Sequence, residues 1–223
     1  MPLDQYRREI DYLRISLTDA CNLRCVYCMP EHMKFRARQD LLSDDELRRL
    51  ITLFGQLGFR KIRFTGGEPT LRPHLADLVR HAATTPGIRR VGLTTNGILL
   101  ARLAHPLRAA GLATVNVSLD TLDETRFRRL TRWGNLRDVQ AGLAAAANVG
   151  LAIKINAVVC RGINDEADVV ALAKLTLNHD WQVRFIEQMP FGNNVTFQTR
   201  GVVRESELHA VLTRTFGPLE EAN

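Results

Sequence analysis

The sequence predicts an α/β protein with the fold of a partial, open (βα)6 TIM-like barrel, and three observations lead to this prediction. Segments with the two-residue period of a strand alternate with segments of helical period along most of the chain. Six strand–helix repeats can be counted, which is fewer than the eight of a closed TIM barrel. No linker divides the chain, so a single domain over residues 1–223 is expected.

The elements follow one another in a regular order. A strand is expected at 12–18, where apolar and polar residues alternate. Ser43 and Glu46 form a capping box at the start of a helix over 44–57, which Gly58 ends. Further strands are expected at 61–65, 90–95, 114–120, 152–159 and 181–188, and further helices near 75–83, 99–110, 124–130, 136–149, 166–178 and 205–216. A loop rich in Gly, Asn and Thr is expected over 192–199.

The strands carry their polar residues on one face. Ile15 opposes Arg14, and Phe64 opposes Arg63, so the apolar faces suit packing against helices. The polar faces would then converge inside the curve of the sheet and form a wet, cationic cavity lined by Arg14, Lys61, Arg63, Lys154 and Arg184. Unpaired buried charge is costly, so an anionic ligand is expected there. An exposed sheet face is the alternative interpretation.

Composition restricts the class of protein. The 223 residues suffice for a substantial core, and 45% hydrophobic with 24% charged residues is ordinary for a globular protein. No apolar run reaches the roughly 18 residues of a membrane span, and the N-terminus has no signal-peptide pattern, so a cytoplasmic location is expected. The net charge of +6 favours an anionic partner. Nucleic acid is not supported, because there is no long Lys/Arg run and aromatic content is 6%.

Three cysteines near the N-terminus form a C-x3-C-x2-C array. Cys21, Cys25 and Cys28 could ligate three irons of a cubane iron–sulfur cluster, which thiolates hold. With no fourth cysteine nearby, one iron would stay open for a cofactor or substrate. Zinc with His32 as the fourth ligand, or simple buried cysteines, are less favoured alternatives. The distant Cys160 is interpreted as a small buried hydrophobic residue.

The second motif is Gly66-Gly67-Glu68-Pro69, directly after a predicted strand. Ligand sites of α/β proteins collect at such strand ends. The glycines permit close approach of backbone to a ligand, and Glu68 offers an acceptor for an amino group. A plain β-turn explains the tetrapeptide equally well when it is taken alone.

Together the two motifs resemble those of the radical S-adenosylmethionine enzymes. The array in residues 21–30 (CNLRCVYCMP) followed by 65–69 (TGGEP) carries this resemblance. Further segments resemble the GTP 3',8-cyclase family, which performs the first step of molybdenum cofactor synthesis: residues 93–97 (LTTNG), 116–120 (NVSLD), 161–165 (RGIND) and 184–187 (RFIE).

The resemblance implies a role for each matching residue. Cys21, Cys25 and Cys28 would hold a [4Fe-4S] cluster, whose open iron binds S-adenosylmethionine. The cofactor-binding residues would be Tyr27, Gly66, Gly67, Glu68, Ser118 and Met189. The GTP-binding residues would be Arg14, Lys61, Arg63, Thr94, Lys154 and Arg184. Without the resemblance, Tyr27 could be a packing aromatic and Met189 a core residue.

The implied reaction is reductive. An electron passes through the cluster and cleaves S-adenosylmethionine to methionine and a 5'-deoxyadenosyl radical, which removes hydrogen from C3' of GTP so that C3' joins C8. The cofactor supplies this chemistry while the protein positions it. The resemblance also implies a low-potential electron donor and a homodimer.

The chain departs from the family pattern in two places. It ends at Asn223 without the C-terminal portion that carries a second three-cysteine cluster in the family, and Ala20 replaces a residue that is usually basic. Three hypotheses therefore stay open: a cyclase-type enzyme or its N-terminal part, a radical enzyme acting on another anionic substrate, or an inactive cluster- or nucleotide-binding paralogue or fragment.

Overall fold

The computed structural model describes residues 2–189 and 201–221, so the predicted loop over 192–199 lies outside the described residues. The strands are β1 (Tyr12–Ser16), β2 (Lys61–Thr65), β3 (Arg90–Thr95), β4 (Thr114–Ser118), β5 (Ala152–Val159) and β6 (Gln182–Glu187). The helices are α1 (Asp44–Gln56), α2 (Leu75–Thr84), α3 (Leu100–Ala109), α4 (Glu124–Thr131), α5 (Leu136–Asn148), α6 (Ala167–Ala173), α7 (Leu175–Asn178) and α9 (Glu205–Phe216). Short 3-10 helices, η1 and η2, cover Arg38–Asp40 and Pro69–Leu71.

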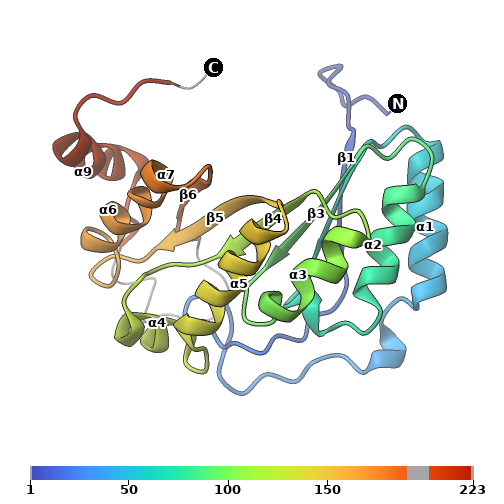
Figure 1. The fold of residues 1–223 in the computed structure, drawn as a ribbon, viewed down its shortest axis with the longest axis horizontal. Helices are drawn as coiled ribbons and strands as arrows, with labels where there is room; N and C mark the ends of the chain where they lie inside the picture. Colours follow the sequence, from blue (N-terminus) through green and yellow to red (C-terminus); the bar gives the residue numbers. More distant parts are fainter. Residues whose placement is uncertain (1, 190–200, 222–223) are drawn as a thin grey trace. The chain divides into compact units, whose positions relative to one another are not determined.

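The strands form one open parallel sheet in the order β1-β2-β3-β4-β5-β6. Strands and helices alternate along the chain (Figure 1). The predicted α/β class and the six open repeats are therefore confirmed. Among the described residues, no helix is both long enough and apolar enough to cross a membrane.

The chain separates into two compact units, which we describe in turn. Unit 1 comprises residues 1–22, 34–117 and 138–153, and unit 2 comprises residues 23–33, 118–137 and 154–223. Strands β4 and β5 each contribute residues to both units. In unit 1 the amide of Ala152, at the start of β5, donates to the carbonyl of Ala113, the residue before β4. In unit 2 the amide of Leu119, the residue after β4, donates to the carbonyl of Asn156 on β5.

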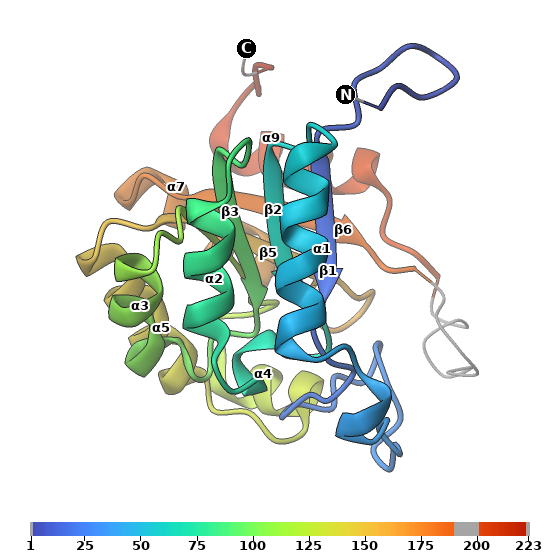
Figure 2. The ribbon, with the colours of Figure 1, turned by 90° about the vertical axis from the view of Figure 1, so that its right-hand side faces the viewer.

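In unit 1, helices α1 and α2 cover one face of β1, β2 and β3 (Figure 2). Ile62 and Phe64 of β2 are fully buried, whereas Lys61 is exposed and Arg63 is half-buried. The alternation predicted for this strand is confirmed, and the polar residues occupy the face opposite to the helices. The capping box at α1 is also present, since Ser43 Oγ accepts from the Glu46 amide and Glu46 accepts from the Ser43 amide.

In unit 2, β5 and β6 pair in parallel, and α6 and α9 lie beside them (Figure 1). Val159 at the end of β5 belongs to a core cluster with Val169, Val203 and Leu208, against which Phe185 of β6 packs. Cys160 is buried, as predicted, and burial raises the pKa of its thiol to about 12. A thiol in this state is a packing group rather than a metal ligand.

Candidate functional site

The cysteine array begins in unit 1 with Cys21 and continues in unit 2 with Cys25 and Cys28. All four cysteines of the chain are thiols rather than disulfides. Cys21 and Cys25 are half-buried, and Cys28 is exposed, although desolvation raises the pKa of its thiol. Within the described ranges, no three His, Cys, Asp or Glu side chains are already arranged to hold a metal ion.

In unit 1, Glu68 is the buried centre of a hydrogen-bond network next to Cys21. Its Oε1 accepts from the amide and hydroxyl of Thr70 and from the Thr95 hydroxyl, at 3.0, 2.5 and 2.7 Å. Its Oε2 accepts from the Asn96 amide at 2.7 Å. Only 1% of the residue is exposed. The carboxylate therefore fixes the loop that follows β3 to the loop that follows β2.

Asn96 reaches from this network to the first cysteine. Its Nδ2 donates to Asn22 Oδ1 at 2.7 Å and to Cys21 Sγ at 3.9 Å. Its Oδ1 accepts from the Ile98 amide at 3.1 Å. Because a backbone N–H can only donate, this last bond determines which end of the side-chain amide faces the sulfur. The NH2 group of Asn96 is therefore directed at Cys21.

Gly66 and Gly67 pass close to the segment before the cysteines. A Cβ at Gly67 would lie 2.4 Å from the carbonyl oxygens of Asp19 and Ala20, and one at Gly66 would lie 2.4 Å from the Thr18 carbonyl oxygen. The Gly67 amide donates to Thr18 and the Glu68 amide donates to Ala20, at 2.6 and 2.8 Å. Packing of backbone on backbone is thus one physical reason for two glycines here.

In unit 2, Tyr27 lies between the second and third cysteines and is hydrogen-bonded to Asp120. The Tyr27 hydroxyl donates to Asp120 Oδ2 at 2.6 Å, and the Val158 amide donates to Asp120 Oδ1 at 2.8 Å. Desolvation and the neighbouring carboxylate raise the pKa of Tyr27 well above 10. Burial, only partly offset by the two donors, raises the pKa of Asp120 from 3.8 to about 6.

Two arginines hold the same part of the cysteine loop against α4. Arg24 is buried, its side chain donates to the Leu23 and Glu31 carbonyls, and its guanidinium lies 4.3 Å from the centre of the Trp133 ring. Arg132, at the end of α4, donates to the Arg24 carbonyl at 3.0 Å. These contacts give a loop without regular secondary structure a defined path.

The polar face of unit 1 brings together four of the predicted substrate residues: Arg14, Lys61, Arg63 and Thr94. Arg14 and Arg63 are direct partners on β1 and β2. Lys61 differs from them, because its ammonium group pairs with Asp11 at 3.2 Å. Thr94 is the partner of Asn116, whose Oδ1 is buried and has no hydrogen-bond partner among the described residues.

Arg63 lies across β3 rather than pointing directly away from the sheet. Its Nε donates to the Tyr12 hydroxyl at 2.6 Å, and its Nη1 donates to the Leu93 carbonyl at 3.1 Å. A Cβ at Gly92 would lie 3.0 Å from the guanidinium carbon. A glycine at this position therefore provides the space that the guanidinium occupies.

The remaining predicted residues lie in unit 2. Lys154 is half-buried on β5, and Arg184 is exposed on β6 opposite Asn156. The Asn156 Oδ1 is a second buried acceptor without a hydrogen-bond partner in the described part of the chain. Ser118 is exposed at the end of β4, and Met189 is 57% exposed, so the alternative interpretation of Met189 as a core residue is wrong.

The sequence of this chain is similar to that of a known protein family and of several known relatives. Residues 15–175 match the Radical SAM superfamily. The chain is 44% identical over 221 residues to a GTP 3',8-cyclase from Pelotomaculum thermopropionicum, a match that covers 98% of this chain and 68% of that protein. A second GTP 3',8-cyclase, from Pseudomonas putida, is 48% identical over 191 residues, covering 85% of this chain and 57% of that protein. The chain belongs to the GTP 3',8-cyclase family of the radical SAM superfamily. It spans between 57% and 68% of the length of these two relatives.

Solved structures support the radical SAM fold. Methylornithine synthase superposes with a TM-score of 0.69 at 15% identity, covering 92% of this chain and 62% of that one. The Streptococcus suis protein SuiB, solved with bound S-adenosylmethionine, superposes with a TM-score of 0.69 at 19% identity, covering 84% and 43%. At these identities the likeness concerns the fold alone.

Sequence reasoning did not select three residues of this radical SAM chain that the structure places beside the cysteines. They are Asn96 next to Cys21, Asp120 on Tyr27, and Arg24 within the loop. Asn96 directly follows the strand predicted over 90–95, and Asp120 is the last residue of the strand predicted over 114–120. Both residues therefore lie at the edge of the sheet where ligand sites collect. That position was the available signal for both.

The buried Asp120 gives unit 2 a testable pH dependence. Its folded pKa of about 6 exceeds its ordinary value of 3.8, so between these values the folded state binds the proton that the unfolded state has released. The free energy of unfolding should therefore fall by about 2 kcal/mol as pH rises from 4 to 6, and level off by about pH 7. Asp120→Asn should remove this decline, as urea unfolding of the cluster-free protein between pH 4 and 7 would measure.

The exposed Asp138 provides the matched control, because Asp138→Asn removes the same charge from a solvated position on α5. It should leave the decline intact. An unchanged decline in Asp120→Asn would show that Asp120 ionises normally in the folded protein.

Proposed function

We propose that this chain is the S-adenosylmethionine-cleaving core of a GTP 3',8-cyclase, in which residues 1–223 act together. The observation that supports this most directly is the 44% identity over 221 residues to a GTP 3',8-cyclase, a match that includes the cysteine array and the Gly66–Pro69 motif. The reaction is then cleavage of S-adenosylmethionine followed by hydrogen abstraction at C3' of GTP and closure of C3' onto C8.

The donor set fits an iron–sulfur cluster. Cys21, Cys25 and Cys28 would hold it, since all three are thiols and soft thiolate ligands suit this group. When bound, the cluster supplies the electron that cleaves S-adenosylmethionine. The protein's own contribution at Cys21 is the Asn96 NH2 group, which donates to a sulfur that becomes negatively charged when it binds iron.

The proposed cofactor-binding residues divide between the two units. In unit 1, Glu68 would accept a hydrogen bond from the amino group of S-adenosylmethionine through Oε2, which accepts from a single donor among the described residues, while Gly66 and Gly67 form the adjoining backbone. In unit 2, Tyr27, Ser118 and Met189 would contact the rest of the cofactor. The Asp120 carboxylate orients the Tyr27 hydroxyl for that contact.

The proposed GTP-binding residues have the charge that a triphosphate requires. Arg14 and Arg63 are neighbouring cations on one face of unit 1, and an anion lying between them would relieve their mutual repulsion. Thr94 and the Asn116 Oδ1, which has no hydrogen-bond partner in the part of the chain that the structure describes, offer polar contacts on the same face. We propose Lys61, Lys154 and Arg184 as further contacts.

Arg63→Ala should weaken GTP binding by more than about 1 kcal/mol, or about fivefold, because it removes a charge-assisted hydrogen bond to phosphate. Anaerobic titration calorimetry with GTP would measure the change. Arg102→Ala, at an exposed position of α3, is the control for lost positive charge and should bind GTP normally. Arg63→Lys, which retains the charge, should recover part of the affinity, and unchanged affinity in Arg63→Ala would remove Arg63 from the site.

The activity itself is tested by anaerobic reconstitution. The protein would receive iron, sulfide and dithionite, and then S-adenosylmethionine with and without GTP. We expect 5'-deoxyadenosine, with a yield that GTP increases. Cleavage that is independent of GTP would instead favour a radical enzyme for another anionic substrate, and a folded protein with no cluster and no cleavage would contradict the proposal.

We further propose three properties that follow from this activity or from the family. A low-potential donor supplies electrons to the cluster. The protein functions in the cytoplasm, where thiols stay reduced. Two copies of the chain form a homodimer. Sedimentation at several protein concentrations tests the dimer. A single species with the mass of one chain would contradict it.

A further inference from the structure

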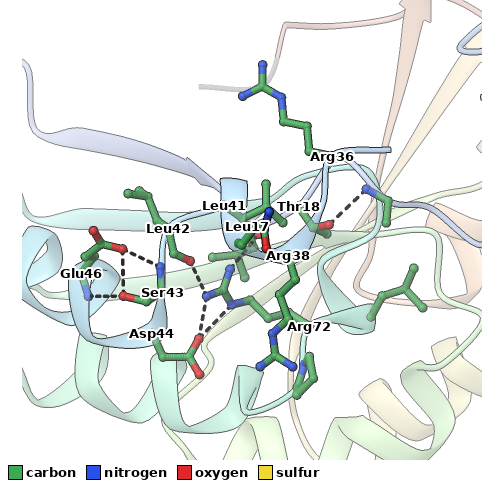
Figure 3. A pocket seen from close by; sticks show the side chains of 14 residues that line it. Leu17, Thr18, Arg36, Arg38, Leu41, Leu42, Ser43, Asp44, Glu46 and Arg72 are labelled. Atoms are coloured by element: carbon green, nitrogen blue, oxygen red, sulfur yellow. Dashed lines mark hydrogen bonds and ion pairs between the residues drawn. The ribbon is translucent and has the colours of Figure 1, made fainter. Parts of the chain in front are cut away.

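Unit 1 contains a cavity of about 460 Å³ beside the start of the cysteine loop (Figure 3). Thr18 and Ala20, from the segment just before Cys21, form part of its wall. Arg36, Arg38 and Arg72 line it as well. Figure 3 shows the Arg36 side chain extending away from the others at the edge of the cavity.

The three arginines of the cavity differ in how their charge is used. Arg72 binds Asp44 through Nε and Nη2 at 2.9 and 2.7 Å, and also donates to the carbonyls of Leu17 and Leu42 at 2.9 and 2.7 Å. This guanidinium is therefore neutralised and largely saturated with hydrogen bonds. Arg36 and Arg38 are exposed, and neither side chain takes part in an ion pair among the described residues.

Arg36 and Arg38 belong to a longer run of exposed positive charge. Lys34, Arg36 and Arg38, which we name the basic strip, alternate along the chain and are all exposed, while Phe35 between the first two is half-buried. No acidic residue occurs from 32 to 39. The basic strip therefore presents three positive charges to solvent without compensation from its own segment.

The basic strip is fixed to the start of the cysteine array. The Arg36 amide donates to Asp19 Oδ2 at 2.9 Å, and Asp19 lies two residues before Cys21. Both residues belong to unit 1. A molecule that binds the basic strip would thus lie beside the chain segment that leads to Cys21, the first cysteine of the proposed cluster loop.

We propose that the basic strip and the adjoining cavity form the docking surface for an acidic one-electron carrier protein, a reduced flavin or iron–sulfur protein. This inference rests on the proposed function, which requires an electron from outside the chain. In the docked complex one electron leaves the carrier and enters the cluster. The carrier is oxidised by one electron, the cluster is reduced by one, and no bond is formed or broken in that step.

The charge and exposure of the surface favour such a carrier over a free small anion. Enclosed phosphate sites use buried donors, but the half-buried guanidinium here, that of Arg72, is already paired with Asp44. Exposed lysine and arginine side chains attract an oppositely charged protein and increase the rate of its encounter with this surface. Redox partners typically form small, weak interfaces of this type.

Binding of a purified acidic bacterial flavodoxin to the cluster-loaded protein tests the proposal. Arg36→Glu with Arg38→Glu should weaken the affinity by at least about tenfold, because like charges then face each other. Binding by the unmodified protein should also weaken as salt is raised. Anaerobic biolayer interferometry measures both effects, and cleavage of S-adenosylmethionine driven by reduced flavodoxin should slow in parallel.

The matched control is Arg80→Glu with Arg102→Glu, which changes the net charge equally at exposed positions of α2 and α3. It should bind flavodoxin normally, and both double variants should retain dithionite-driven cleavage. Equal weakening in the two variants, no weakening in either, or displacement of flavodoxin by inorganic phosphate at constant ionic strength would overturn the docking surface. Absence of dithionite-driven cleavage in the unmodified protein would instead count against the proposed function.

Discussion

Glu68→Ala is expected to lower the free energy of unfolding by at least about 3 kcal/mol, because it leaves buried donors without an acceptor. The donors are the Thr70 amide and hydroxyl, the Thr95 hydroxyl and the Asn96 amide. The two backbone amides cannot rotate toward other acceptors, so their desolvation cost persists. Urea unfolding of the cluster-free protein would measure the loss.

Glu68→Gln is a sharper version of the same test. The single carbonyl oxygen of glutamine can accept from the Thr70 amide or from the Asn96 amide. In either orientation the NH2 group of the side chain faces the other backbone N–H. We expect a loss of about 1–3 kcal/mol from that one unsatisfied pair. Glu166→Ala at an exposed position should change stability by less than about 0.5 kcal/mol. Equal stability of Glu68→Ala and Glu166→Ala would contradict the network.

The elements that the sequence predicted best are those with a strong local signal. β2 and β3 have the predicted bounds, and α1 begins at its predicted capping box and ends just before Gly58, whose φ is +93°. In each case neighbouring residues determine the outcome: alternation in a strand, or a side chain that caps a helix three residues away. Local patterns of this kind predict an element correctly even when its tertiary contacts are unknown.

Elements whose bounds depend on tertiary contacts were predicted less well. The helix expected over 166–178 is interrupted at Lys174 and divides into α6 and α7. The strand expected over 114–120 ends at Ser118, and Asp120 then uses its side chain, not its place in a strand, to bind the Val158 amide. Hydrophobic period alone does not show where a side chain will replace a backbone partner.

The residues of the candidate site also fall into those that a local pattern predicts and those that depend on tertiary contacts. Spacing alone identified Cys21, Cys25 and Cys28 as candidate ligands, since the three lie within eight residues. Asn96 is separated from Cys21 by 75 residues, and Asp120 from Tyr27 by 93. No local pattern links residues so far apart, so only the three-dimensional arrangement could pair them.

Asn96→Asp is expected to reduce cluster retention or S-adenosylmethionine cleavage by about 10–100-fold, the usual cost of losing a partner of a metal ligand. The Ile98 amide holds one side-chain oxygen, so the variant must direct its second carboxylate oxygen toward Cys21 Sγ. A hydrogen-bond donor is then replaced by a negative charge beside a thiolate. The added negative charge destabilises the reduced cluster more than the oxidised cluster, because the reduced cluster carries one more electron. The reduction potential of the cluster should therefore become more negative. Iron content and an EPR-monitored redox titration measure the two effects.

Two further variants separate the charge from the hydrogen bond. Asn96→Ala loses the donor without adding charge, so its potential should shift in the same direction by a smaller amount. Asn22→Ala removes the other acceptor of Asn96 Nδ2 and leaves the donor to Cys21 in place. Its potential should stay close to that of the unmodified protein, which distinguishes the bond to sulfur from general loosening of the loop. An Asn96→Asp protein with unchanged iron content and unchanged potential would show that the Asn96 amide does not act on the cluster ligand.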